Sequence, residues 1–363
     1  MWGYHRRLIE RELDRWVGSG WVSAEGAANI RADLAKSGGI GLAGVLGILA
    51  SVLLAFAAMS FVAAHWDEIP RLARLLLLVC GLVWGGYAAA GYFHNKGMPA
   101  FTDAAILFAS AAFGASIMLI SQMYHIQGDP PDGVLMWWAG TLAGGVLLRS
   151  NPTLALTLIL VCVWSGLVMS EHNGPHWPFL IGWGLVSAAF VWQRWYPGVH
   201  LSGLALSIFV FSLGLTLQHG HAHALVTGLG LLAAAGAIAA ERTSPEWNTL
   251  ARPALGYGAA TAFAGLMMLQ FFERAAPGEL ALLAAFTLAF LLALIWYGLT
   301  HDERGALWLG YIGFSIEILS LYAKTVGTLL DTSLFFLIAG LIFAALAFVA
   351  YRLLGRRGSE AGA

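Results

Sequence analysis

Long apolar runs separated by short polar connections repeat along most of this chain. Twelve of the runs reach or approach the roughly 20 residues that a helix needs to cross the hydrocarbon core of a bilayer. They lie near residues 40–64, 72–93, 101–122, 133–149, 152–170, 177–193, 199–217, 222–240, 251–272, 278–299, 305–323 and 332–354. The pattern predicts an all-α fold, a polytopic integral membrane helical bundle of about twelve transmembrane helices.

The segment before the first run has a different pattern. Apolar side chains recur at helical spacing from Leu8 to Val17, glycines interrupt the pattern, and Ser23 can cap a second helix. We expect a short cytoplasmic amphipathic helical hairpin over 1–39, a transmembrane bundle over 40–354 and a short polar cytoplasmic tail over 355–363. The hairpin either lies on the bundle or, through residues 1–36, docks a protein partner.

Composition supports a membrane location. Hydrophobic residues make up 59% of the chain and charged residues 11%, where a soluble domain carries roughly 25% charged residues. These values exclude a soluble enzyme and predict the lipid bilayer as the main partner. The formal net charge of −1 leaves no electrostatic footprint for nucleic acid.

The basic residues predict an orientation. With twelve spans, 15 of the 19 Lys and Arg residues fall on the side that holds both termini. Because cytoplasmic loops carry the excess of Lys and Arg, we expect cytoplasmic N- and C-termini.

Polar loop residues on the opposite, periplasmic side form the first candidate site. The segment from Ser121 to Gly133 combines amides, a phenol, an imidazole and carboxylates with two prolines that stiffen it. Such a loop suits a preorganised binding site, or it is only a turn whose aspartates bond to the backbone. The candidates are Gln122, Tyr124, His125, Asp129 and Asp132, with Asp67 and Asp331 from two other loops on that side.

Metal and cofactor chemistry is not predicted. Histidines gather near 171–176 and 218–223, but the alternating His219, His221 and His223 have no carboxylate or helical i,i+4 pair to fix a ligand geometry. Both cysteines lie inside apolar runs. No nucleotide-binding or catalytic motif is visible, so the catalytic residues stay unknown.

Inside the runs, one charge and several small residues stand out. Glu317 lies about twelve residues into the eleventh run, where an ionised group is costly, so it is a candidate proton-coupling or substrate-facing group. The alternative is a protonated carboxyl bonded to a neighbouring helix. Glycines 228, 230 and 236 predict close helix packing. Tryptophans near the ends of runs, including Trp137 and Trp138, are expected as interfacial anchors.

Two sequence segments carry a resemblance to a known family. The run HWDEIPRLARLLLL at 65–78 and the segment SQMYHIQGDPPDG at 121–133, after a helical hairpin, resemble the bacterial predicted membrane proteins of domain-of-unknown-function 2157. The resemblance covers roughly the first 150 residues and implies a multi-pass protein of the bacterial inner membrane. The family has no established activity, so no catalytic residue follows from it.

Three functions remain open. The sequence favours a transporter-like carrier, because of the many spans, the buried carboxylate and the polar periplasmic loop. A non-catalytic subunit or sensor acting through its cytoplasmic hairpin comes next. An enzyme acting on a lipid-linked or periplasmic substrate is the least favoured of the three.

Overall fold

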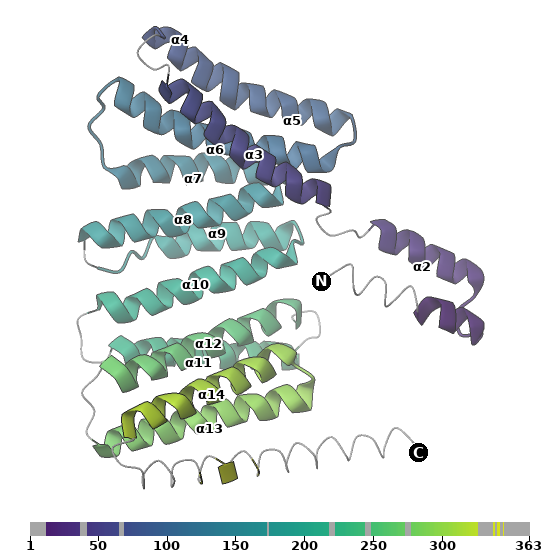
Figure 1. The fold of residues 1–363 in the computed structure, drawn as a ribbon, viewed down its shortest axis with the longest axis vertical. Coiled ribbons are helices and arrows are strands. Elements are labelled where there is room, and N and C mark those ends of the chain that lie inside the picture. The colour runs from purple at the N-terminus through teal and green to yellow at the C-terminus, as the bar shows by residue number, and fades with distance from the viewer. Residues whose placement is uncertain are drawn as a thin grey trace. The chain divides into compact units, whose positions relative to one another are not determined.

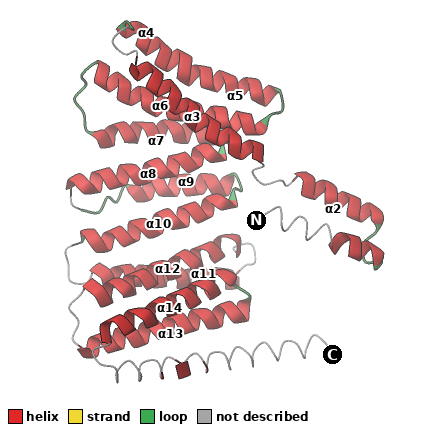
Figure 2. Cartoon of the chain, in the orientation of Figure 1, coloured by secondary structure: helices red, strands yellow, loops and turns green. Residues whose placement is uncertain are grey.

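The computed structural model describes two compact units, and the boundary between them along the chain falls within one helix. It covers residues 12–36, 42–64, 69–172, 174–217, 222–243, 248–272 and 277–325, with the single residues 337, 340, 341 and 344. The units are residues 1–160 and 161–363. Within the described ranges every regular element is a helix and none is a strand (Figure 2).

The first unit is built around one long helix. Its elements are α2 (Ala24–Lys36), α3 (Leu42–Ala64), α4 (Arg71–Leu76), η1 (Leu77–Trp84), α5 (Gly85–Asn95), α6 (Pro99–Met123), α7 (Pro130–Leu147) and the first part of α8 (Asn151–His172). Helix α6 packs against α3, η1, α5 and α7. Before α2, residues 12–18 are helical, and Arg31 contacts Asp14 across the turn. The hairpin's cytoplasmic location stays a prediction.

The second expected span contains a π-helix that its sequence does not predict. The apolar stretch Leu77–Trp84 is a π-helix, continuous with α4 before it and α5 after it. Runs of π-helix are rare and often mark functional positions in a helix.

The second unit is centred on α12. It comprises the rest of α8, then α9 (Phe179–Trp192), α10 (Tyr196–Thr216), α11 (Ala222–Thr243), α12 (Asn248–Phe272), α13 (Pro277–His301) and α14 (Arg304–Thr325). Helix α12 contacts α10, α11, α13 and α14, and α13 pairs with α14 (Figure 1). The core of the unit therefore lies along α12.

Glycine sets the spacing of α11 and α12. A Cβ added at Gly230 would lie 2.3 Å from the backbone nitrogen of Ala262, and one at Gly265 would lie 2.6 Å from that of Thr227. Gly228 and Gly236 have nothing within 4 Å of the same position. Of the three glycines expected at a close contact, only Gly230 lies in one.

Eight described helices are long and apolar enough to cross a membrane. They are Arg71–Asn95, Pro99–Met123, Asn151–His172, Tyr196–Thr216, Ala222–Thr243, Asn248–Phe272, Gly278–His301 and Arg304–Lys324. Helices α3, α7 and α9 occupy three more of the expected positions, and the run at 332–354 lies outside the described residues. A helical membrane fold with multiple spans is confirmed, whereas the count of twelve stays a prediction.

Two tryptophans expected as interfacial anchors lie instead between helices. The indole of Trp137 donates to the carbonyl oxygen of Ser110 at 2.9 Å and lies against Gly114, where a Cβ would meet it at 2.0 Å. Trp138 is 8% exposed. That expectation was wrong for both, because they lie near the middle of α7, where it packs on α6.

Candidate functional site

The predicted periplasmic loop is an exposed turn between α6 and α7. Each of its five described candidates, Gln122, Tyr124, His125, Asp129 and Asp132, is exposed. His125 has a φ of 51°, and its Nδ1 lies 3.0 Å from the carbonyl oxygen of Gln122. Among the described residues, no hydrogen bond or ion pair joins this imidazole to either aspartate.

Two other loop candidates cannot be placed. Asp67 and Asp331 lie outside the described residues. Within the described part of the loop, no hydrogen bond or ion pair joins the candidate side chains to one another, and the role of the loop in binding stays a prediction.

Glu317, by contrast, lies at the centre of a buried polar cluster. Its side chain is 0% exposed, on α14. The Gln270 side chain of α12 donates through Nε2 to Glu317 Oε1 at 3.0 Å and to Thr287 Oγ1 of α13 at 3.1 Å. Three helices thus bring a carboxyl, an amide and a hydroxyl together inside the spans.

Two oxygen atoms of this cluster have no hydrogen-bond donor. They are Oε2 of Glu317 and Oε1 of Gln270, and both are buried. The Thr287 hydroxyl uses its hydrogen on the carbonyl oxygen of Leu283 at 2.8 Å, so it cannot supply one. A buried acceptor without a donor costs about 1–3 kcal/mol. The cluster therefore has more hydrogen-bond acceptors than donors, and a proton on Glu317 would add one donor.

Lys324 closes the cluster toward the end of the helices. Its ammonium donates to the backbone carbonyl oxygen of Gln270 at 3.0 Å and lies 3.7 Å from the centre of the Phe271 ring. Gln270 therefore contacts Glu317 through its side chain and Lys324 through its backbone. The Lys324 ammonium therefore contacts Gln270, the residue whose amide bonds the Glu317 carboxyl. It bonds the backbone of Gln270 and not the carboxylate of Glu317.

An apolar layer borders the cluster on its other side. Phe314, one turn before Glu317, packs with Leu291 of α13 and Phe263 of α12. Leu291 and Phe314 are almost fully buried, at 0% and 1% exposed. This layer separates Glu317 from the far ends of the same helices.

A second polar cluster occupies those far ends. Arg252 Nε of α12 lies 2.7 Å from Glu303 Oε1 and 3.7 Å from Glu241 Oε1. The Tyr297 hydroxyl of α13 donates to Glu241 Oε2 at 2.5 Å. Burial raises the pKa of the Glu303 carboxyl, the Arg252 charge opposes that rise, and the charges of Glu241 and Asp302 add to it.

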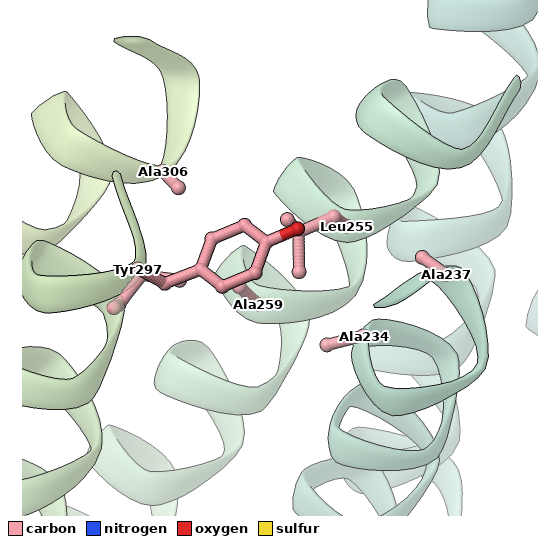
Figure 3. Packing of buried hydrophobic residues seen from close by; sticks show 7 residues of the cluster. Ala234, Ala237, Leu255, Ala259, Tyr297 and Ala306 are labelled. Carbon is pink, nitrogen blue, oxygen red and sulfur yellow. The ribbon is translucent and has the colours of Figure 1, made fainter. Parts of the chain in front are cut away.

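Small side chains let Tyr297 reach this cluster. Its ring lies among Ala234, Ala237, Leu255, Ala259 and Ala306, which belong to α11, α12 and α14 (Figure 3). The ring also stacks on His301, with centroids 4.3 Å apart. In the sequence Arg252 counted only toward orientation, and these contacts, which join residues up to 56 positions apart, were not predicted.

Metal ligation finds no geometric support in the part of the chain that the structure describes. No group of three or more His, Cys, Asp or Glu side chains there could hold an ion. His176 instead packs edge-on against Trp164 with ring centroids 4.4 Å apart. Burial lowers the pKa of His176, and the nearby His172 lowers it further.

Comparison with known proteins confirms the resemblance found in the sequence. A family model described as "Predicted membrane protein (DUF2157)" matches residues 14–154, so this part of the chain carries the family's sequence pattern. No curated protein and no solved structure matches the chain. The match covers neither Glu317 nor the Arg252 cluster.

Proposed function

We propose that the protein is a proton-coupled carrier in which Glu317 takes up and releases a proton within the spans. The supporting observation is the buried carboxyl whose Oε2 lacks a donor beside the unpaired Oε1 of Gln270. An ionised carboxylate at this depth is costly, and protonation removes that cost. Intramembrane carboxyls of this kind mark proton relays in pumps and transporters.

Gln270 and Lys324 give the carboxyl two stable states. When Glu317 is protonated, the Gln270 amide keeps its bond to Oε1. When Glu317 is ionised, the Lys324 ammonium, held on the backbone of the same glutamine, is the nearest compensating charge. Proton release would therefore draw Lys324 toward the carboxylate and strain its contact with Gln270. We propose that this change of partner by Lys324, from the Gln270 backbone to the Glu317 carboxylate, couples proton release to movement of α12 and α14.

We place the protein in the bacterial inner membrane with both termini in the cytoplasm, because of the distribution of Lys and Arg. Gln270 and Lys324 then lie near the periplasmic ends of their helices. Protons would reach Glu317 from that side, since the Phe263–Leu291–Phe314 layer lies on the other.

Carbodiimide labelling tests the proton site. Dicyclohexylcarbodiimide reacts with protonated carboxyls in apolar surroundings, and peptide mass spectrometry locates the adduct. We expect labelling of Glu317 in lipid nanodiscs and its loss in Glu317→Gln, while the exposed Glu279 stays unlabelled in both. Failure to label Glu317 in the folded protein contradicts the proton site.

A flux assay tests the carrier. Proteoliposomes with a trapped pH dye are challenged separately with amino acids, sugars and inorganic anions. At least one class should acidify the lumen with the wild type and not with Glu317→Gln. Labelling of Glu317 without acidification by any class would retain the proton site and contradict the carrier.

A subunit or sensor function is the second candidate. Its support is Trp21, which is 75% exposed at the turn between the helical residues 12–18 and α2. A large exposed aromatic side chain on a small helical pair suits a protein contact. Deletion of residues 1–36 should then abolish co-purification of a partner and leave the helical content of the bundle unchanged.

A further inference from the structure

An apolar groove runs along the surface of the second unit. It has a volume of about 540 Å³ and is lined by residues of α9, α10, α11 and α12 and by Trp177, just before α9. From Val199 to Leu213 of α10 it follows 14 residues, which at about 1.5 Å per residue is roughly 21 Å. Leu180, Val191 and Leu229 in its lining are 38%, 48% and 39% exposed.

The few polar groups of the groove are already paired. Ser187 Oγ donates to Ser202 Oγ at 2.9 Å, and Trp183 Nε1 donates to the carbonyl oxygen of Ser202 at 2.8 Å. The groove thus offers a ligand an apolar wall with no free donors from these groups. Its length and polarity fit an extended hydrocarbon chain.

A polar pocket adjoins one end of the groove. It has a volume of about 560 Å³, and its lining includes Arg252, Glu303, His200 and Asn248. Tyr257 lines both the groove and the pocket. Gly203 allows this ring to lie against α10, because a Cβ there would be 2.4 Å from Tyr257 Cδ2. One aromatic ring therefore forms the common wall of an apolar and a polar compartment.

The charges of the pocket favour a ligand with both signs. Arg252 is engaged through Nε by Glu303 and Glu241, and its side chain is 49% exposed. Its terminal nitrogens can therefore bond a phosphate. The lining holds one guanidinium, Arg252, and one carboxylate, Glu303, so a ligand that carries both a phosphate and an ammonium can bond both groups. A purely anionic headgroup has no cationic donor for Glu303.

We propose that the groove and pocket together bind one phospholipid with a primary-ammonium zwitterionic headgroup, of the phosphatidylethanolamine type. One acyl chain lies in the groove, the phosphate bonds Arg252, and the ammonium donates to Glu303. A phosphate and an amine at the end of a long apolar chain match the order of the two compartments. An apolar helix from a second copy would fill the groove but bring neither a phosphate to Arg252 nor an ammonium to Glu303.

Lipid competition tests the headgroup. Purified full-length protein in detergent is titrated with phosphatidylethanolamine, phosphatidylcholine or phosphatidylglycerol of identical acyl chains, and bound lipid is counted by native mass spectrometry. We expect one phosphatidylethanolamine to be retained about tenfold more tightly than either of the others, the effect of one charge-assisted hydrogen bond. Tighter binding of phosphatidylglycerol, or equal binding of all three, would overturn the assignment.

Two pairs of variants locate the site. Arg252→Gln should lower the affinity about tenfold, whereas Arg242→Gln, at an exposed position outside the pocket, should leave it unchanged. Ala233→Phe, which fills the groove, should abolish retention, whereas Ala235→Phe, two residues along α11 and outside the groove, should not. Equal effects within either pair would overturn the site, as would loss of a dimer instead of a lipid in Ala233→Phe. Glu317 takes no part in this test, so its outcome is independent of the proposed carrier function.

Discussion

Gly230→Ala tests the close approach of α11 and α12. The new Cβ would lie 2.3 Å from the backbone nitrogen of Ala262 and 2.8 Å from the carbonyl oxygen of Gly258. Neither atom can rotate away, since both belong to the backbone of α12. Ordinary contact begins near 3.4 Å, so the two helices must separate by about 1 Å.

The cost follows from packing and helix propensity. Overpacking costs about 1–3 kcal/mol, and a backbone clash belongs at the upper end of that range. Replacing a helical glycine by alanine by itself raises the free energy of unfolding by about 0.5–1 kcal/mol. We expect a net loss of about 2 kcal/mol for Gly230→Ala. Gly228→Ala, with nothing within 4 Å, should gain about 0.5–1 kcal/mol instead.

The free energies of unfolding can be compared in mixed micelles. Both variants and the wild type are titrated with sodium dodecyl sulfate, and helix loss is followed by circular dichroism. The two variants should lie on opposite sides of the wild type, separated by about 3 kcal/mol. If Gly230→Ala is as stable as Gly228→Ala, the close contact does not exist in the membrane-solubilised protein and the reasoning is refuted.

Two further predictions follow from single side chains. Because the pKa of Glu303 is raised above 4.5, the folded state holds this proton more tightly than the unfolded state. Stability should therefore fall as the pH rises from about 4.5 through the folded-state pKa, and Glu303→Gln should flatten that fall in unfolding titrations from about pH 4 to about pH 8. Trp137→Phe removes the hydrogen bond to the carbonyl oxygen of Ser110 and should lower the free energy of unfolding by about 0.5–1.5 kcal/mol in the same micelle assay; an unchanged value would mean that the bond contributes nothing.

Hydropathy predicted the helices well because a span is a local property. Each of the eight long apolar helices coincides with a run of the sequence, and so do α3, α7 and α9. The π-helix at Leu77–Trp84 was not predicted, because its apolar residues fit either hydrogen-bond spacing equally. The choice of Gly230 over Gly228 also depends on which face of α11 meets α12, and the apolar residues around these two glycines do not mark that face.

The candidate sites, too, could be predicted from the sequence only where a local signal marked them. Glu317 was found because a lone carboxylate contrasts with its apolar run. Its partner Gln270 lies 47 residues earlier, in the last turn of α12, and nothing local distinguishes it. The polar loop at 122–132 was singled out by composition alone. Composition cannot tell a convergent site from a simple turn; the five described residues are exposed, and their role in binding stays a prediction.

The apolar layer of Phe263, Leu291 and Phe314 has an electrical consequence. Glu317 lies eight residues from the end of α14, or about 12 Å along a helix that rises about 1.5 Å per residue. The hydrocarbon core is roughly 30 Å thick, so a proton arriving from that end crosses about 40% of the membrane voltage. At 100 mV this amounts to about 0.9 kcal/mol of a total near 2.3 kcal/mol. The larger part of the voltage falls across the apolar layer and the helix ends beyond it, so in the proposed carrier 100 mV should shift proton binding at Glu317 about fivefold, against about 50-fold for a complete crossing.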